Sequence, residues 1–491
     1  MTDAFVLGGV RTPVGRYAGS LSHLRTDDLL GRTMVAACER VGVPLERIED
    51  IAAGCVNPAH EGMGDIARWA ALAAGFPDSV PAATVNRFCA SSLTCAIQVA
   101  HAIRSDELSV GLAAGVESMS RSGWAFMKGE APFMPRGPVL LLDTMWAGAG
   151  GPPNPALVAR DAYVDMMRTA QNVADRYSLS REEIDAFALR SHQHAAAARD
   201  SGRLAAEIQP VEIEATRKQP ASTFEHDESI RDDTTQEKLA ALPPQPNTTQ
   251  MTAGNSSPLN DGASAVVLAN AAAAEELGVE PLARVVASAT HALDPQVMGI
   301  APAFAIPKAL ARAGLKPEEI DIWEVHEAYA SVAVAILREL PNQLDGFEVP
   351  DERLNPNGGA VAIGHPFGSS GTRYVLTLAT ELRLREARYG VLGVCVGSGQ
   401  GVALVLENPG AACAVPSVDH PSPPKFRTRQ SRRRRWDTAL SGARNPRPLG
   451  PAWPCSSGLR LPSANAARSR RRWPSRQARA PSRGSAPRRG W

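Results

Sequence analysis

Short apolar segments alternate with amphipathic segments through most of this 491-residue chain, and the alternation occurs in two successive series. The first series predicts strands at 5–9, 50–56, 110–116 and 263–270, and helices at 26–41, 66–74 and 91–104. The second series predicts strands at 283–289, 320–325, 389–396 and 402–407, and helices at 303–313, 327–340 and 371–384. Alternating strands and helices are typical of βαβ units. We therefore predict an α/β protein with a mostly parallel sheet, built as two copies of one fold.

The pattern changes between about residues 118 and 250, where loops rich in Pro and Gly precede a predicted helix at 181–199. Ser180 and Glu183 have the spacing of a capping box at the start of that helix. This segment is predicted to form a loop domain inserted into the first half. The predicted domains are thus 1–270, including the insertion, and 271–408.

Residues 409–491 differ in composition from the rest of the chain. They contain one Lys and 18 Arg against two Asp, a balance of +17, which leaves −16 for residues 1–408. Because the segment has little aliphatic periodicity, it cannot bury enough apolar surface to offset its ordering entropy, and we predict a disordered tail. Its Arg runs could bind nucleic acid or an acidic surface, but a solvated tail or translation past the natural end of the gene is favoured. No nucleic-acid binding is expected from residues 1–408.

The cysteine content and the hydropathy of the chain indicate the cellular compartment of the protein. The seven Cys are odd in number and irregularly spaced, which favours a reducing environment over a disulfide scaffold. No apolar stretch reaches the roughly 18–20 residues of a membrane-spanning helix, and the N-terminus is predicted to be a strand rather than a signal peptide. No Cys or His spacing indicates a zinc site. We predict a cytoplasmic protein without a metal.

Four residues are candidates for catalysis. Cys89 precedes the helix at 91–104, where free N–H groups and the helix dipole favour a thiolate, although most cysteines are small buried hydrophobes. His365 lies between Gly364 and Pro366 in a glycine-dense loop, which favours a site residue. Cys395 ends a strand and precedes a glycine-rich turn that could direct N–H groups at an oxyanion.

His326 lies where a strand meets a helix, and a ligand-binding role and a helix-capping role are equally compatible with that place. Cys38, Cys55 and Cys95 have no such surroundings and are predicted to be structural. One reactive thiol, a histidine that takes its proton and a second thiol as acid and base would together suit acyl transfer through a thioester.

Across roughly residues 4–408 the sequence resembles the thiolases, the acyl-CoA acetyltransferases and 3-ketoacyl-CoA thiolases. The resemblance rests on an ordered series of short motifs: Arg11-Thr-Pro, Asn86-Arg-Phe-Cys89, Gly115-Val-Glu-Ser-Met-Ser120, Thr169-Ala-Gln-Asn-Val-Ala174, Asp227-Glu-Ser-Ile-Arg231, Thr252-Ala-Gly-Asn-Ser-Ser257, His326-Glu-Ala-Tyr-Ala, Gly364-His-Pro and Cys395-Val-Gly. It implies a layered α/β/α/β/α fold with an inserted loop domain.

The resemblance also implies a ping-pong reaction. Cys89 would carry the acyl group with His365 as its base, and Cys395 would exchange a proton with C2 of acetyl-CoA. The N–H groups of Cys89 and Gly397 would form one oxyanion hole, and His365 with His326, acting through water, the other. Coenzyme A would lie against the loop domain, with Ser257 near its pantetheine arm and Met166 lining the pocket.

Acyl-CoA, acetyl-CoA and CoA would be substrates, with no separate cofactor, and the protein would be a homodimer or homotetramer. Two positions depart from the pattern of the short-chain thiolases, which often have Asn at the place of His326 and His at that of Asp165. A further departure is Ser398, where the family commonly has Gly. The resemblance therefore favours a degradative 3-ketoacyl-CoA thiolase of broad or medium chain length.

Three other functions stay open at this point. One is a short-chain acetyl-CoA acetyltransferase that makes acetoacetyl-CoA. A second is a ketoacyl-carrier-protein synthase, whose one Cys and two His could be matched by Cys89, His326 and His365 but would leave Cys395 without a role. The third is a non-catalytic thiolase-like lipid-binding protein, against which the presence of both thiols argues.

Overall fold

A computed structural model describes residues 2–58, 60–125, 141–145, 154–215 and 220–411. These residues belong to the first of two compact units, which divide at Ser417. The predicted disordered tail lies outside the described residues, apart from residues 409–411. No helix in the described part of the chain is long and apolar enough to cross a membrane.

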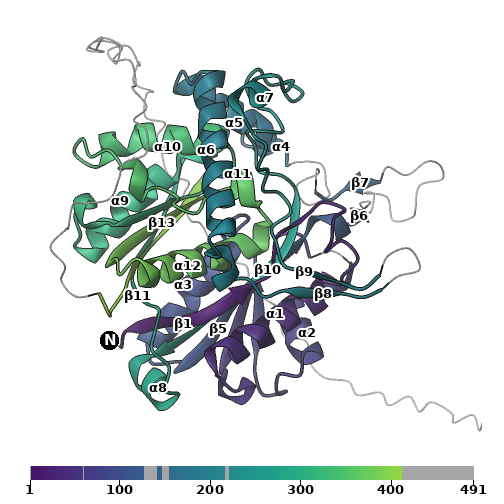
Figure 1. Cartoon of the computed structure of the whole chain (residues 1–491), viewed down its shortest axis with the longest axis vertical. Coiled ribbons are helices and arrows are strands. Elements are labelled where there is room, and N and C mark those ends of the chain that lie inside the picture. The colour runs from purple at the N-terminus through teal and green to yellow at the C-terminus, as the bar shows by residue number, and fades with distance from the viewer. Residues whose placement is uncertain (1, 59, 126–140, 146–153, 216–219, 412–491) are drawn as a thin grey trace, which may run out of the picture. The chain divides into compact units, whose positions relative to one another are not determined.

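A ten-stranded sheet forms the centre of this unit (Figure 1). Its strands follow one another across the sheet in the order β12 (Ile322–Val325), β13 (Tyr389–Val396), β14 (Gln400–Glu407), β11 (Ala283–Ala292), β1 (Ala4–Arg11), β10 (Asn260–Asn270), β5 (Val110–Ser118), β3 (Asp50–Gly54) and β4 (Ala82–Val85). The short β2 (Gly15–Arg16) pairs with β10. Strand β4 was not predicted from the sequence.

The pairing repeats across the two halves of the sheet. In the first half β3 runs parallel to β5, which is antiparallel to β10, which is antiparallel to β1. In the second half β12 runs parallel to β13, which is antiparallel to β14, which is antiparallel to β11. This repeat supports the predicted duplication.

The prediction of a mostly parallel sheet was wrong, because only β3–β4, β3–β5 and β12–β13 are parallel. A parallel neighbour needs a long crossover connection, whereas β13 and β14 are joined by a short turn.

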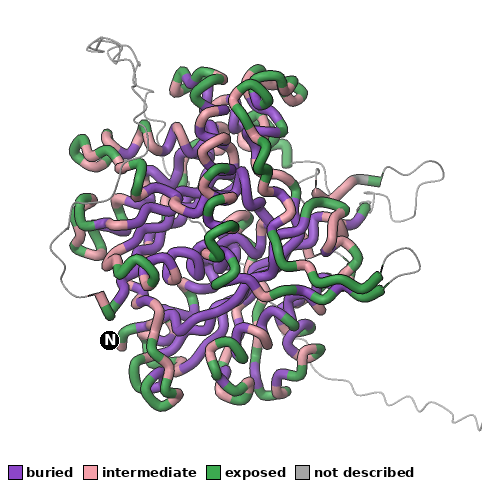
Figure 2. Tube along the Cα trace, in the orientation of Figure 1, coloured by how far each residue is buried: buried purple, intermediate pink, exposed green. Residues whose placement is uncertain are grey.

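Helices cover both outer faces of the sheet and fill the space between its halves. The first outer layer contains α1 (Thr26–Val41) and α2 (Ile66–Ala73), the central layer α3 (Ser91–Arg104) and α12 (Phe367–Leu384), and the second outer layer α9 (Pro302–Ala313) and α10 (Ala330–Gln343). Three large clusters of buried apolar residues occupy the interfaces between these layers. Figure 2 shows the sheet and the central helices as the most deeply buried elements. The α/β/α/β/α layering is therefore confirmed.

Strand β13 shows why a strand between two helical layers is apolar throughout. Val391 and Cys395 pack in the outer cluster with α9 and α10, whereas Leu392, Val394 and Val396 pack in the central cluster with α3 and α12. Successive side chains of a strand point to opposite faces, so both faces of β13 are buried.

Glycines allow the two central helices to approach closely. A Cβ on Gly371 of α12 would lie 2.0 Å from the backbone nitrogen of Leu93 in α3, and a Cβ on Gly368 would lie 2.3 Å from the carbonyl oxygen of Val116 in β5. Neither distance is compatible with a side chain. The first turns of α3 and α12 are thereby packed together, and the residues that precede each helix come to the same place.

The insertion contains more helix than the sequence predicted. Besides α6 (Arg181–Asp200), which has the predicted capping box at Ser180 and Glu183, it contains α4 (Pro155–Ala159), α5 (Met166–Arg176) and α7 (Gln236–Ala240), and the short strand pairs β6–β7 (Trp124–Ala125, Leu142–Asp143) and β8–β9 (Val211–Ile213, Ser222–Phe224). Helix α5 was not predicted because its buried side consists mostly of small and polar residues, Thr169, Ala170, Gln171, Val173 and Ala174. Asp165 caps it by accepting the N–H of Arg168. Two further short helices, α8 (Ala271–Glu276) and α11 (Ala360–Ile363), lie outside the insertion.

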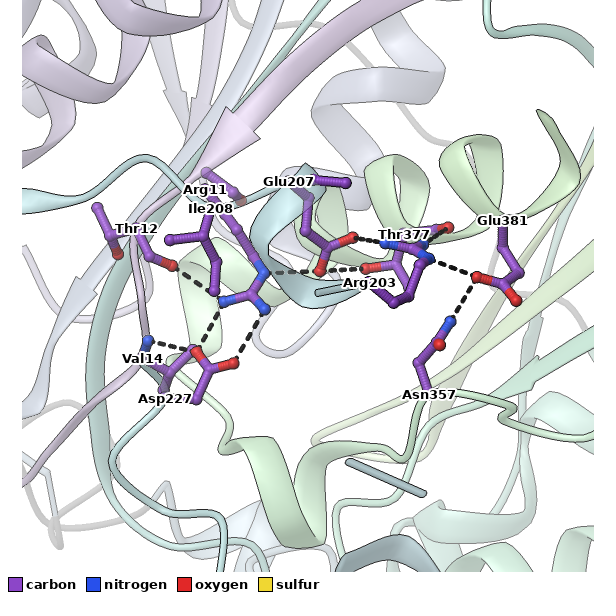
Figure 3. Close-up of polar contacts among 12 residues, drawn as sticks. Arg11, Thr12, Val14, Arg203, Glu207, Ile208, Asp227, Asn357, Thr377 and Glu381 are labelled. Carbon is purple, nitrogen blue, oxygen red and sulfur yellow. Dashed lines mark hydrogen bonds and ion pairs between the residues drawn. The ribbon is translucent and has the colours of Figure 1, made fainter. Parts of the chain in front are cut away.

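A chain of buried charges attaches the insertion to the sheet (Figure 3). Arg11, at the end of β1, donates to Glu207 at 2.7 Å and to both carboxylate oxygens of Asp227 at 2.7 and 3.0 Å. Arg203 bridges Glu207 and Glu381 of α12. Because every charge in this chain is paired, its burial is tolerated, and removal of one partner costs about 3–5 kcal/mol. The network fixes the insertion against α12.

Candidate active site

The two central helices bring Cys89 and His365 into one region. Cys89 lies two residues before α3, and His365 lies two residues before α12. His326 directly follows β12, and Cys395 is the second-last residue of β13, which is parallel to β12. Since the carboxyl ends of parallel strands meet at one edge of the sheet, His326 and Cys395 also come together.

Cys395 contacts His326, which in turn contacts His365. The Nδ1 atom of His326 lies 3.2 Å from Sγ of Cys395, and the rings of His326 and His365 lie 4.3 Å apart at 63°. Two thiolates at Cys89 and Cys395 would repel each other, and this repulsion contributes to the raised pKa of Cys395. The structure therefore brings together the four residues selected from the sequence.

Cys89 is half-buried, and its setting is less favourable to a thiolate than predicted. Burial raises the pKa of its thiol to about 12, although hydrogen bonds from the backbone of Gly397 and of Cys89 itself lower that pKa. Helix α3 begins only at Ser91, and its N-cap residue is Ala90. Burial thus outweighs the effect of the helix N-terminus. Cys89 is a thiol in this structure and needs a base in order to react.

The backbone around His365 is held by a buried amide. Oδ1 of Asn260 accepts the His365 N–H at 2.9 Å, and the Asn260 amide donates to the carbonyl of Gly15 at 2.9 Å. Gly364 has φ +112°, and a Cβ there would lie 2.6 Å from Oδ1 of Asn260. Only glycine fits this position. The Gly-His pair is therefore set by β10, a strand distant in sequence.

The His365 side chain is oriented by Ser370. Nδ1 of His365 lies 2.7 Å from Oγ of Ser370, which donates its own hydrogen to the carbonyl of Pro366 at 2.9 Å. A hydroxyl has one hydrogen, so this arrangement makes Nδ1–H the donor and leaves the lone pair on Nε2. Nε2 is buried and has no hydrogen-bond partner among the described residues. Burial, His326 and Arg373 lower the pKa of His365 well below its usual value, so the imidazole is neutral and can accept a proton.

Cys395 and His326 are both fully buried. Burial holds the pKa of Cys395 well above its usual value and, together with the charge of Arg373, lowers the pKa of His326 to about 3. Helix α10 begins at Ala330 with Tyr329 as its N-cap residue, so His326 does not cap it. The capping alternative for His326 was therefore wrong.

Gly397 lies in the turn between β13 and β14. A Cβ on Gly397 would lie 3.3 Å from the ring of Phe88, so a side chain there would crowd the residue before Cys89. The backbone of Gly397 hydrogen-bonds to Cys89. The role of the Gly397 N–H as an oxyanion-hole donor stays a prediction.

The two residues predicted to bind CoA lie in or next to the insertion. Met166 begins α5 and is 37 % exposed. Ser257 is half-buried, and its N–H donates at 3.1 Å to the carbonyl of Ala328, in the segment that carries His326. Their contact with CoA stays a prediction. No group of three or more His, Cys, Asp or Glu that could hold a metal is found where the chain is described.

Family models match nearly all of the described chain. "Thiolase, N-terminal domain" matches residues 4–272, and "Thiolase, C-terminal domain" matches residues 279–408. The chain belongs to the thiolase family. As thiolases are acyltransferases, it is an enzyme of that class.

Named relatives of this thiolase act on different acyl-CoA substrates. A beta-ketoadipyl-CoA thiolase of Pseudomonas aeruginosa is 43% identical over 82% of this chain and 99% of its own length. The peroxisomal 3-ketoacyl-CoA thiolase A of Mus musculus is 40% identical over 83% of this chain and 92% of its own. The crystal structure of human mitochondrial 3-ketoacyl-CoA thiolase in complex with CoA superimposes with a TM-score of 0.75 at 33% identity, over 83% of this chain and 98% of that one.

Several residues that support the thiolase site were not selected from the sequence. Glu117 of β5 accepts the N–H groups of Val56, Asn57 and Gly368, and so joins the loop after β3 to the first turn of α12. Ser370 and Asn260 position His365. Each is a polar residue whose partner is distant in sequence or depends on a turn. Although Glu117 lies in the quoted motif Gly115–Ser120, its role could therefore not be read from the sequence.

Proposed function

We propose that this protein is a 3-ketoacyl-CoA thiolase, an acyl-CoA:acetyl-CoA C-acyltransferase. The observation that carries the proposal is the gathering of two thiols and two neutral imidazoles in one site. The 3.2 Å and 4.3 Å contacts connect Cys395, His326 and His365, and Cys89 lies close enough to affect the pKa of Cys395. A synthase with a single cysteine would leave the contact between Cys395 and His326 without a use. A lipid-binding protein would need none of the four groups.

In thiolysis, Nε2 of His365 takes the proton of Cys89 as its sulfur attacks the 3-keto carbon. The negative oxygen forms near the N–H groups of Cys89 and Gly397. The C2–C3 bond breaks, Cys395 gives its proton to C2, and acetyl-CoA leaves. The thiol of CoA then gives its proton to Cys395 as its sulfur attacks the acyl-Cys89 thioester, and the departing Cys89 sulfur takes back the proton held by His365. Groups that are neutral at rest suit these steps, because each proton is transferred only as the substrate reacts.

Burial keeps Cys395 a thiol at rest, the form that can give a proton to C2 in thiolysis or to the departing CoA thiolate in the reverse reaction. Degradation is proposed as the working direction from the resemblance of His326 to the degradative pattern. The reaction would need no cofactor besides CoA and acyl-CoA as substrates.

Two substrate classes compete within this function. The resemblance of His326 and Asp165 to the degradative pattern favours unbranched 3-ketoacyl-CoA of medium length. The relative at 43% identity favours a 3-oxoadipyl-CoA, whose acyl chain ends in a carboxylate. A short-chain acetoacetyl-CoA synthase is the weaker alternative. A homodimer or homotetramer in the cytoplasm stays part of the proposal.

Covalent labelling tests the proposed chemistry. Wild-type protein incubated with an acyl-CoA should gain one acyl group on Cys89, and Cys89→Ala should gain none. Cys38→Ala, which removes a fully buried thiol outside the site, serves as the matched control and should label normally. Acylation of Cys38, Cys55 or Cys95 with Cys89 unmodified would refute the proposal. Rates with 3-oxoadipyl-CoA, acetoacetyl-CoA and a series of longer unbranched 3-ketoacyl-CoA then decide the substrate class.

A further inference from the structure

The sulfur of Cys395 lies among hydrogen-bond donors. Nδ1 of His326 is 3.2 Å away, and the backbones of Ala328 and of Cys395 itself hydrogen-bond to the thiol and favour its ionised form. His326 and Ala328 come from the segment after β12, and Cys395 comes from β13. These donors approach from two neighbouring strands of one sheet.

Such donors are needed because the proposed reaction makes a buried thiolate. When the S–H bond of Cys395 breaks and a C–H bond forms at C2 of acetyl-CoA, the electron pair stays on the sulfur. Cys395 is fully buried, and an unpaired anion in that place would be strongly disfavoured.

The ring of His326 also hydrogen-bonds to the backbone carbonyl of Cys395, which raises the pKa of His326, so Nδ1 carries its hydrogen and is shared between that carbonyl and Sγ of Cys395. The remaining groups around the ring do not bond to Nδ1. The ring of Tyr374 lies 5.6 Å away at 77°, and that of His365 lies 4.3 Å away, so both are ring contacts. Arg373 acts on His326 through its charge, and Glu327 is bound by Ser191 and Asn355. Nε2 of His326 is buried and unpartnered among the described residues. Nδ1 is thus the nitrogen of His326 that hydrogen-bonds to Cys395.

We propose that His326 is a catalytic residue that holds the Cys395 thiolate through its Nδ1–H group during the C2 proton transfer. This inference rests on the proposed thiolase function and assigns a different atom from the role expected for His326 at a water-bound oxyanion. The proton balance is closed, because Cys395 gives its proton to C2 and recovers one from the incoming CoA thiol. In condensation the same donor holds the thiolate that removes the C2 proton.

A pair of amide substitutions distinguishes the two nitrogen atoms. In His326→Asn the amide nitrogen is attached to Cγ, as Nδ1 is, whereas in His326→Gln it is one bond further out, close to the place of Nε2. The readout is deuterium uptake at the methyl group of acetyl-CoA in D₂O, measured by mass spectrometry, because this exchange follows the C2 proton step. Acylation of Cys89 is measured separately by intact mass.

We expect His326→Leu to lose exchange by about 10²–10³-fold while Cys89 acylates within about threefold of the wild-type rate. His326→Asn should recover exchange to within about tenfold of wild type, and His326→Gln should stay as low as His326→Leu. His194→Leu is the matched control, since the hydrogen bond of the His194 ring in the described chain goes to the backbone carbonyl of Asn355 and not to a residue of the site. It should leave exchange unchanged.

Three outcomes would overturn the inference: recovery by Gln and not by Asn, equal loss in all three His326 variants, or no loss in His326→Leu. If His326→Leu fails to fold, as judged by its melting temperature, the comparison of Asn with Gln decides alone. Failure of Cys89 to acylate in the wild-type enzyme would instead refute the proposed function. The two failures are therefore distinguishable.

Discussion

The two thiols of the site differ in the elements that hold them and in what can reach them. Cys89 lies in the loop before α3 and is half-buried, whereas Cys395 lies within β13 and is fully buried. A thiol that must receive a whole acyl group needs an open approach. A thiol that exchanges one proton with a bound methyl group does not. The comparison indicates that exposure, more than the thiol pKa, separates the nucleophile from the acid, because burial raises the pKa of both.

The largest expected effect comes from removing each thiol in turn. Cys89→Ala should abolish thiolysis, since the other cysteines of the described residues are all buried. Cys395→Ala should still form the acyl-enzyme but lose condensation by about 10²–10⁴-fold, the usual scale for a positioned acid–base group. Intact mass and a condensation assay check the two steps separately. Failed acylation in Cys395→Ala, with acylation retained in Cys89→Ala, would exchange the two assignments.

A smaller effect is expected from Ser370→Ala. This change removes the acceptor that orients Nδ1–H of His365, so acylation of Cys89 should slow by roughly tenfold, the value of one or two lost hydrogen bonds. Deuterium exchange at the methyl group of acetyl-CoA, which depends on Cys395, should slow less than the acylation of Cys89. Ser369→Ala is the control, because the Ser369 hydroxyl donates to Ser264 and not to the histidine. Equal slowing in both variants would show a general loosening of α12 instead.

The sequence predicted the four residues that the structure brings together, but not the polar residues that position them. Cys89, His326, His365 and Cys395 lie in short motifs at element boundaries, where an isolated reactive residue stands out. The closeness of the four residues depends on the packing of α3 against α12 at Gly371 and on the parallel pairing of β12 with β13. The repeated strands and helices predicted the duplication and the layers, but not the antiparallel direction of β10, which enters the sheet from the insertion.

Two buried carboxylates, one in each half, predict a pH dependence of stability. Burial raises the pKa of Glu117 in β5 to about 7 and that of Glu324 in β12 to about 8. The folded state therefore holds a proton that the unfolded state has lost, and the free energy of unfolding falls as pH rises from about 4.5 to these values.

Glu324→Gln tests this dependence cleanly, since neither oxygen of Glu324 has a partner among the described residues, whereas Glu117 accepts three N–H groups. Glu324→Gln should be more stable than wild type at pH 8.5 by about 1–3 kcal/mol and nearly equal to it at pH 5. Glu117→Gln should be less stable at both, because an amide nitrogen would face a backbone donor. Urea unfolding at the two pH values measures this, and an unchanged difference between pH 5 and pH 8.5 in Glu324→Gln would contradict it.

The smallest expected effect concerns the turn that carries Gly397. Ser398, the next residue, has φ +63°, a left-handed conformation that costs a non-glycine residue free energy. Ser398→Gly should relieve this strain, and the relief is partly offset by the greater entropy of glycine in the unfolded chain. We expect a gain of about 0.5–1 kcal/mol in the free energy of unfolding, measured by urea titration. Acylation of Cys89 should be unchanged, because the N–H of Gly397 keeps its place. Slower acylation in a more stable Ser398→Gly variant would show that strain in this turn helps to aim the N–H of Gly397 at Cys89, and that the two thiols are linked through the turn between β13 and β14.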